Sequence, residues 1–332
     1  MRTAIALTGL AASLACSLAP VSAHARARVF VASYGNDSNP CTFGSPCKTF
    51  QHAVDVVDFE GEVTAIDSAG FGPINITSSV TITSPPGVEA GIAAPAPGGA
   101  AITINTTTIG ETITLSGLTL DGARVSNSTG ISFKGSLGFL NVRDCVIRNF
   151  SQDGIDFSTV QGGYLSVSNT VVSDNGDAGI AYFPTNQIAS ASITLNRVEM
   201  RHNGLYGFFL WGALSTGQDY IVANVVESTV SGGQFGIYAL TAPQHTSVDI
   251  SLFHSVVTAT NTATLFDTAA LFADGGGGAG IADITVANST VSGNVVDWKA
   301  NSGGQVLSFG DNYFIGNHQT SGALPIVSPL TH

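Results

Sequence analysis

Three consecutive passages of the chain decide its fold: LNVRDCVIRN at residues 140–149, LSVSNTVVSDN at 165–175 and ITLNRVEMRHN at 193–203. In each passage apolar residues occupy the first, third and eighth positions, and polar turn residues lie between the two apolar groups. Alternation of apolar and polar residues is typical of a half-buried strand. Each passage therefore predicts two short strands that meet at a polar corner.

The same pattern recurs along most of the chain. Matching passages start at residues 113, 140, 165, 193, 223, 250, 284 and 307, so the repeat length varies between 23 and 34 residues. A variable period of this size indicates a solenoid in which each coil is one structural unit. A third apolar element follows 13 or 14 residues after four of the starts, at Gly154, Gly179, Gly207 and Gly236. Three short strands per coil predict a three-sided prism.

A single coil cannot bury its own inward-facing residues. The next coil covers them and satisfies its backbone groups when it lies about 4.8 Å further along the axis. We therefore expect an all-β, right-handed single-stranded parallel β-helix with three short strands per coil and about 8–10 coils. The expected inward rows are Leu140, Leu165, Ile193, Ala223, Ile250, Ile284 and Leu307, and Ile147, Val172, Met200, Val230, Val257, Val291 and Phe314.

Polar residues also recur in register at the corners. We expect ladders of stacked side chains there, because asparagine bonds along a stack and tolerates left-handed backbone. Generic surface turns are the alternative. Cys145 occupies an inward position and is expected to be a small buried apolar residue. The two corner sets are Asp144, Asn169, Asn288 and Asp311, and Asn175, Asn203, Asn294 and Asn317.

The first 25 residues have the pattern of an export signal, with Arg2, an apolar run and an A-x-A site at 23–25. The apolar run is too short to favour a permanent membrane anchor. Cys16 raises the alternative of a lipoprotein, but its preceding residues are a poor acylation context. The expected divisions are a signal peptide at 1–25, an N-terminal cap at 26–60, the β-helix at 61–320 and a C-terminal tail at 321–332.

The expected cap combines a stapled loop with a helix. Cys41 and Cys47 lie in a turn-rich segment of an exported chain, which favours a disulfide between them. Metal binding is the lesser alternative, because we identify no histidine or second cysteine pair beside them. Thr49 begins a helical pattern with apolar residues at 50, 53, 54 and 57, so we expect a short capping helix.

The charge balance limits the partners. The chain has a net charge of −12, and removal of residues 1–25, which hold one arginine and no acidic residue, makes it −13. This balance argues against nucleic acid and anionic membranes as partners, and against a polyanionic substrate unless a cation bridges the two. No oligomeric state follows from the sequence.

Three passages resemble a family of secreted bacterial proteins with right-handed β-helix repeats, within the pectin-lyase-like superfamily. They are VFVASYGND at 29–37, leading to Cys41 and Cys47; GEVTAIDS at 61–68; and SFGDN at 308–312. The resemblance implies a β-helix, and the enzymes of this superfamily act on acidic polysaccharides. The Asn-Thr-Asp and Gly-His-Gly motifs of polygalacturonases, the Arg-x-Pro-x-x-Arg of pectate lyases and the Asp-Pro-His of mannuronan epimerases do not occur in this sequence.

Titratable residues gather in the coils that start at 140, 165 and 193. Stacking is expected to place Arg148 beside Ser173 and Arg201, and Asp174 beside His202. Carboxylates beside a cation would bind Ca²⁺, if the protein is a lyase, or move a proton next to a uronate carboxyl group. The alternative is turn chemistry with paired surface charges. The candidate catalytic residues are Asp153, Asp174, Asp177, Arg148, Arg201 and His202.

The third strand of each coil offers a candidate binding face. If Ile155, Ile180, Phe208 and Ile237 point inward, the following residue of each strand points outward. Exposed aromatic rings beside a carboxylate at the coil spacing would stack against sugar rings. Alternatively, a loop at residues 211–220 folds over these rings and buries them. The candidate substrate-binding residues are Asp156, Phe209, Trp211 and Tyr238.

The sequence is compatible with three functions. The first is a secreted protein, extracellular or periplasmic, that binds extracellular or cell-surface polysaccharide without catalysis. The second is a polysaccharide lyase or glycoside hydrolase acting on an acidic glycan. The third is a structural or adhesin-like solenoid. Apart from Ca²⁺ in the case of a lyase, we expect no cofactor.

Overall fold

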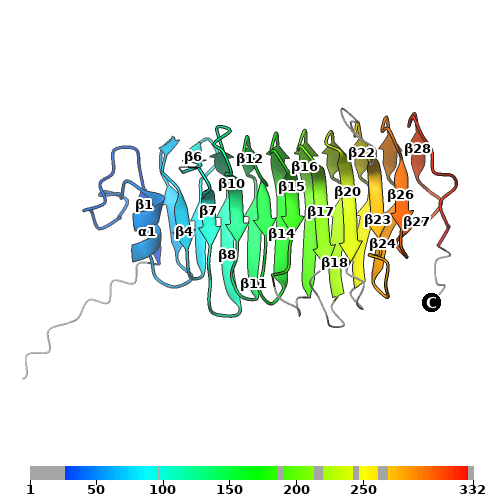
Figure 1. The fold of residues 1–332 in the computed structure, drawn as a ribbon. Helices are drawn as coiled ribbons and strands as arrows, with labels where there is room; N and C mark the ends of the chain where they lie inside the picture. Colours follow the sequence, from blue (N-terminus) through cyan, green and yellow to red (C-terminus); the bar gives the residue numbers. More distant parts are fainter. Residues whose placement is uncertain are drawn as a thin grey trace, which may run out of the picture.

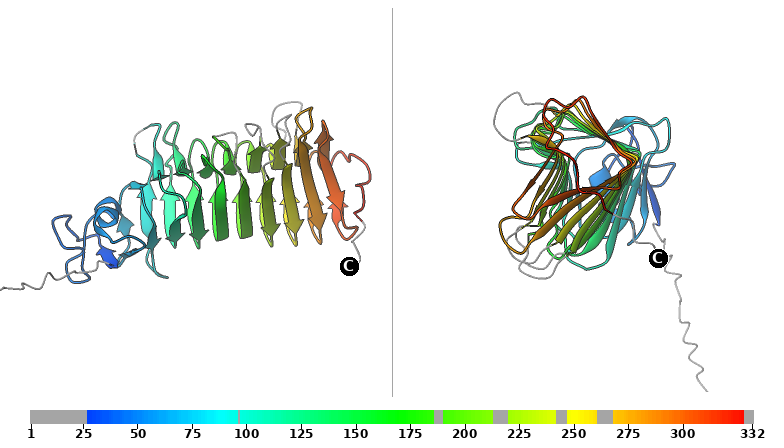
Figure 2. Two further views of the ribbon diagram at one scale, coloured as in Figure 1. Left: turned by 90° about the horizontal axis from the view of Figure 1, so that it is seen from below. Right: turned by 90° about the vertical axis from the view of Figure 1, so that its right-hand side faces the viewer.

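The computed structural model describes residues 27–95, 97–185, 190–212, 220–241, 247–260 and 268–327. Within these residues the chain winds into coils that stack along one axis, from β1 at one end to β28 at the other (Figure 1). A view along the axis shows the three sides of the prism (Figure 2). The expected signal peptide at 1–25, Cys16 and residues 328–332 of the expected tail lie outside the described residues.

The third strands of the coils form one parallel sheet of nine strands, and the first and second strands together form a second sheet. We call the nine-stranded sheet the third sheet. Its strands are β4 (Ile74–Ile76), β7 (Ala100–Ile104), β10 (Thr129–Phe133), β13 (Ile155–Phe157), β15 (Ala178–Tyr182), β17 (Tyr206–Gly212), β20 (Phe235–Thr241), β23 (Ala269–Asp274) and β26 (Trp298–Asn301).

Two sides of the prism belong to the larger sheet because β14 (Gly163–Ser173) and β16 (Ala191–Arg201) each run through the corner between them. The other first strands are β1 (Arg28–Val31), β2 (Glu62–Ala65), β5 (Val80–Thr83), β8 (Glu111–Ser116), β11 (Gly138–Arg143), β18 (Tyr220–Val226), β21 (Ser247–Phe253), β24 (Ile281–Ala287) and β27 (Gln305–Ser308). The other second strands are β3 (Ala69–Gly70), β6 (Ala90–Ala93), β9 (Leu118–Asp121), β12 (Val146–Arg148), β19 (Thr229–Ser231), β22 (Val256–Thr258), β25 (Thr290–Ser292) and β28 (Tyr313–Ile315).

The predicted inward rows are confirmed, with one exception. The register joins Leu140 to Leu165 and continues through Ile284, and it joins Ile147 to Val172 and continues through Phe314. In the last coil, however, Ile284 pairs with Val306, so the prediction of Leu307 as the inward residue is wrong. Both positions are apolar, and a slip of one residue exchanges the two faces of a strand. Val306, only 1% exposed, takes the buried place.

The predicted corner ladders are confirmed where side chains meet. Asn175 Nδ2 donates to Asn203 Oδ1 at 3.0 Å, and Asn203 Nδ2 donates to the carbonyl of Val172 at 3.1 Å, with both asparagines 2% exposed. At the other corner Asn169 Nδ2 donates to Asp144 Oδ1 at 3.3 Å, and both residues have left-handed backbone. Cys145 is buried, as expected. These bonds run from coil to coil and hold the stack in register.

The N-terminal end carries the predicted disulfide and helix. Cys41 and Cys47 are bonded, and α1 (Phe50–Val56) begins after Thr49, whose hydroxyl accepts a hydrogen bond from the backbone N–H of His52 at 3.2 Å. Phe50 and Ala53 form the buried face of α1. The helix lies at the end of the stack, beside β1, β2 and β4 (Figure 1). Within the described residues no helix has the length and apolar character that a membrane crossing requires.

Candidate functional site

The outer surface of the third sheet contains the predicted binding residues. The register aligns Ser132, Asp156, Ala181, Phe209, Tyr238, Phe272 and Lys299 in one outward row. Their inward neighbours Ile155, Ile180, Phe208 and Ile237 are fully buried, as the alternation predicted. Asp156, Phe209 and Tyr238 therefore lie in one row on one side of the solenoid, with Ala181 between Asp156 and Phe209.

The rings of this face cover one another. Tyr206 stacks on Phe209 with centroids 4.4 Å apart, and Tyr238 stacks on Phe272 at 4.5 Å. Phe183 packs edge-on against both Phe209 and Trp211. We call the set the outer aromatic cluster: Phe183, Tyr206, Phe209, Trp211, Phe235, Tyr238 and Phe272.

The expectation of an exposed ring is wrong for Phe209, which is 7% exposed. Rings on adjacent coils are spaced at about 4.8 Å, which is close to the preferred ring-stacking distance, so they close on each other. Trp211 and Tyr238 are partly exposed. The alternative, a loop at 211–220 that buries these rings, falls largely outside the described residues, at 213–219.

Three predicted carboxylates lie beside the cluster. Asp153 Oδ1 accepts a hydrogen bond from the backbone N–H of Ala178 at 2.9 Å, and burial, together with the charges of Asp177 and Asp156, raises the pKa of Asp153 to about 7. Burial also raises the pKa of Asp156, which accepts hydrogen bonds from Ser158 and Ser132, and the pKa of Asp177. Asp177 Oδ1 is buried without a hydrogen-bond partner. Groups with shifted pKa values of this kind are candidates for proton transfer.

The predicted cations belong to a separate group. Arg148, Ser173 and Arg201 are aligned as expected, but Arg148 pairs with Asp121 at 3.0 Å and Arg201 pairs with Glu199 at 2.9 Å. These side chains are about half exposed, and such surface pairs contribute little to stability.

At the same corner His202 Nδ1 lies 3.7 Å from Asp174 Oδ1. Asp153 and Asp177 lie beyond the buried Asn175–Asn203 ladder, at the start of the third strands. The structure thus divides the six candidate residues between two sides of a corner, and neither arginine forms an ion pair with Asp153 or Asp177.

Sequence reasoning missed a second surface, the outer side of the first strands, which we call the first-strand face. Phe139 and Tyr164 stack there with centroids 4.6 Å apart and an interplanar angle of 7°. Phe139 is 36% exposed, Tyr164 48% and Tyr220 62%. A shallow depression of about 360 Å³ is lined by Tyr164, Tyr220 and Val222, among others. The signal was available, because Phe139 and Tyr164 directly precede the inward residues Leu140 and Leu165.

A polar row runs along the same face. Its members pair in register from β5 to β24 and carry only hydroxyl or amide groups: Thr81, Thr114, Asn141, Ser166, Thr194, Asn224, Ser251 and Thr285. A depression of about 440 Å³ opens over part of this row and also contacts Arg143 and Ser168. The face thus offers hydrogen-bonding side chains at the coil spacing, next to exposed rings.

Two carboxylates face each other further along the first-strand face. Asp249 and Asp283 pair in register, in the same outward row as Tyr164, Ser192 and Val222. Burial and the charge of Asp249 raise the pKa of Asp283, and Asp283 Oδ1 is buried without a hydrogen-bond partner. Ser247 Oγ donates to Asp249 Oδ2 at 2.8 Å. Sequence reasoning did not single out this pair.

Comparison with solved structures identifies the fold. The pectate lyase Pel9A superposes with a TM-score of 0.59 over 85% of this chain and 74% of its own, at 14% identity. XylC, solved in complex with xylose, superposes with a TM-score of 0.55 over 82% of this chain and 70% of its own, at 8% identity. ORF18 of Geobacillus virus E2 gives 0.50 over 83% of this chain and 55% of its own, at 14% identity.

No family model and no curated protein matches the sequence. At these identities the structural similarity shows the fold alone. The chain is a right-handed parallel β-helix, and the pectate lyase Pel9A has a similar fold.

Proposed function

We propose that this chain is an exported protein whose first-strand face binds extracellular or cell-surface polysaccharide. The observation that carries the proposal is the exposed, stacked pair Phe139 and Tyr164, with Tyr220 nearby, beside a continuous row of hydroxyl and amide groups. A sugar ring has an apolar face that stacks on aromatic rings and a rim of hydroxyls that exchange hydrogen bonds. Both kinds of partner lie side by side here.

The repeat spacing suits a polymer rather than a single sugar. Each coil advances the face by about 4.8 Å, a rise comparable to the length of one sugar residue. A glycan chain lying along the axis would therefore meet equivalent hydrogen-bonding groups at each coil, such as Asn141, Ser166 and Thr194. The similar fold of a pectate lyase and of a protein solved with xylose supports a carbohydrate ligand.

Charge favours a neutral or sparsely charged glycan. The chain has a net charge of −12, and Asp249 and Asp283 contribute to the first-strand face itself. An acidic polysaccharide would be repelled unless a divalent cation neutralised part of the charge. We therefore expect binding to neutral glycans without added metal, and binding to acidic glycans only with Ca²⁺.

Export is the other half of the proposal. The signal pattern at 1–25 and a disulfide in the segment that follows both suit a protein of an oxidising compartment. N-terminal sequencing of the protein recovered outside the cytoplasm should begin at Arg26. Recovery of the intact chain in the cytoplasm would contradict this half.

The experiment is a screen of immobilised plant and bacterial polysaccharides with the folded protein, with and without Ca²⁺. Tyr164→Ala should weaken binding to every glycan that the wild-type protein retains, because it removes half of the stacked pair. Tyr34→Ala is the matched control, since Tyr34 is 69% exposed but lies before the first complete coil. Equal losses in both variants, or no binding at all by the wild-type protein, would reject the proposal.

A second candidate function, polysaccharide cleavage, rests on the Asp249 and Asp283 pair. In-register residues on parallel strands lie about 4.8 Å apart, and two carboxylates at such a distance with a raised pKa suit acid–base catalysis. Asp153, with a pKa of about 7, is the alternative acid. A catalytic protein should release new reducing ends or unsaturated sugars, and Asp283→Asn or Asp153→Asn should abolish the release. Binding without any product would leave only the first function.

A further inference from the structure

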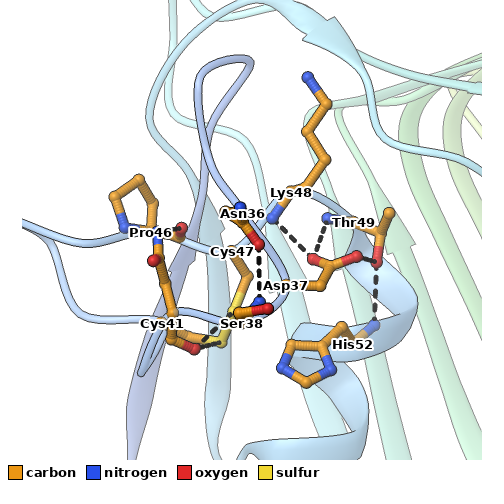
Figure 3. Close-up of a disulfide and its surroundings, with 10 residues drawn as sticks. Asn36, Asp37, Ser38, Cys41, Pro46, Cys47, Lys48, Thr49 and His52 are labelled. Carbon is orange, nitrogen blue, oxygen red and sulfur yellow. Dashed lines mark hydrogen bonds between the residues drawn. A yellow bond between two sulfur atoms is a disulfide. The ribbon is translucent and has the colours of Figure 1, made fainter.

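The disulfide at the N-terminal end has a third potential metal ligand beside it. The Sγ atoms of Cys41 and Cys47 and a ring nitrogen of His52 all lie within 4.8 Å of one another (Figure 3). Sequence reasoning found no histidine beside this pair, but α1 begins only three residues after Cys47 and its first turn carries His52 back toward the sulfurs. Two cysteines and one histidine are a ligand set that zinc prefers.

Backbone hydrogen bonds, independent of the disulfide, fix the position of both cysteines. The N–H of Phe30 donates to the carbonyl of Cys41 at 2.8 Å, and the N–H of Cys47 donates to the carbonyl of Phe30 at 2.9 Å. The N–H of Ala32 donates to the carbonyl of Cys47 at 3.0 Å. Both residues are thus bonded to the β1 segment on their own account, and both are buried, at 1% and 0% exposure. Breaking the sulfur–sulfur bond therefore leaves the two side chains side by side.

A separate set of bonds holds His52. Asp37 Oδ1 accepts hydrogen bonds from the backbone N–H groups of Lys48 at 2.7 Å and Thr49 at 2.9 Å, which fixes the start of α1 relative to the loop (Figure 3). Burial alone would raise the pKa of Asp37, but these hydrogen bonds outweigh it and lower the pKa, with a contribution from the nearby charge of His52. A carboxylate close to the histidine also adds negative charge beside the three ligands, which favours a cation.

We propose that reduction of the Cys41–Cys47 disulfide converts this end of the molecule into a binding site for a zinc-like divalent ion. A dithiol reductant supplies two electrons and two protons, becomes a cyclic disulfide itself and leaves two cysteine thiols. The ion then displaces the two thiol protons and binds both sulfurs and the free nitrogen of His52, and water completes a tetrahedron. In the oxidised protein Cys41 and Cys47 have no thiolate to offer, so the site is absent.

The remaining described cysteine does not compete. Cys145 lies among the β-strands, far along the chain from the loop, and burial raises the pKa of its thiol to about 11. It therefore stays protonated at neutral pH, and thiolate is the form that binds metal. In the reduced chain we therefore expect the metal ion to bind at Cys41 and Cys47 and not at Cys145.

The test is a titration of the mature full-length protein with Co²⁺, after reduction by a dithiol and removal of the reductant under anaerobic conditions. Reduced wild-type protein should bind one ion with a thiolate-to-cobalt absorption band, and Zn²⁺ should displace the cobalt. Reoxidation should abolish the band. His52→Ala should weaken affinity by more than about tenfold, because even loss of a group that only orients a ligand costs that much. His254→Ala is the matched control at an exposed histidine of a distant coil and should have no effect.

Three results would overturn the proposal. Equal affinity in His52→Ala and wild type would show that the histidine is not a ligand. Absence of the band in the reduced protein would show that the thiols do not converge on a metal. Loss of native hydrogen-exchange protection around Cys41 and Cys47 on reduction would show that the backbone bonds do not hold the loop.

Discussion

The outer surface of the third sheet and the first-strand face have the same backbone geometry, but they differ in how far their aromatic side chains are exposed. Both belong to the same coils, and both present one outward residue between inward ones. On the third sheet, large rings on successive coils close over each other, and Phe209 is 7% exposed. On the first-strand face most outward residues are small and polar, so the few rings stay open, with Tyr164 48% exposed. In a solenoid, an outward side chain is therefore exposed only if the side chains on the adjacent coils are too small to cover it.

The largest expected effect contrasts one ring from each face. Phe209→Ala should lower the free energy of unfolding by about 3–5 kcal/mol, the usual range for truncating a buried phenylalanine. Tyr164→Ala should cost less than about 1 kcal/mol, because its ring is half exposed and only one face is covered. Chemical denaturation followed by circular dichroism measures both. Similar costs for the two variants would mean that the outer aromatic cluster does not act as a second core.

A smaller effect contrasts two asparagines. Asn203→Ala should destabilise the protein by about 1–3 kcal/mol, because it leaves the buried Asn175 amide and the carbonyl of Val172 without their partner. Asn224→Ala, in the exposed polar row of the first-strand face, should change stability by less than about 0.5 kcal/mol. The same denaturation experiment reads both. A large cost at Asn224 would show that the polar row is structural rather than available for a ligand.

The last effect depends on pH and concerns the buried carboxylate of the third-sheet side. The pKa of Asp153 is raised from 3.8 to about 7 in the folded protein, so its ionisation opposes folding and stability falls as the pH rises from about 4 to 7. Asp153→Asn removes this loss and should raise stability at pH 8 by up to about 4 kcal/mol, because a pKa difference of one corresponds to about 1.4 kcal/mol, with little difference at pH 4. Asp58→Asn, at an exposed carboxylate, is the control. A variant less stable than wild type at pH 8 would contradict the raised pKa.

The fold could be predicted because each coil repeats the same pattern of buried apolar positions and polar corners. Rows such as Ile147, Val172 and Met200 indicate a buried position that recurs in each coil. The corner asparagines indicate the turns between the strands. The failure at Leu307 has the same origin, since Val306 and Leu307 are both apolar and only pairing with Ile284 decides which one enters the core.

The candidate site was less predictable, because surface accessibility depends on neighbours that are distant in sequence. Nothing in the order of residues around Phe209 shows that Tyr206 and Tyr238 will cover it. The pairing of Arg148 with Asp121, 27 residues earlier, likewise depends on how coils are joined. His52 approaches the cysteines only because the loop and α1 are fixed together. Such groupings follow from register and loop path, which residue pattern alone does not specify.

The assignment of the ligand to the first-strand face is tested most directly by hydroxyl-radical footprinting with and without a polysaccharide that the protein retains. Modification of each aromatic side chain is read by mass spectrometry, so one experiment reports on both faces. Bound glycan should protect Phe139, Tyr164 and Tyr220 and leave Trp211 and Tyr238 modified at their unbound rates. Protection of Trp211 and Tyr238, with Tyr164 unchanged, would contradict the account and return the binding site to the third sheet.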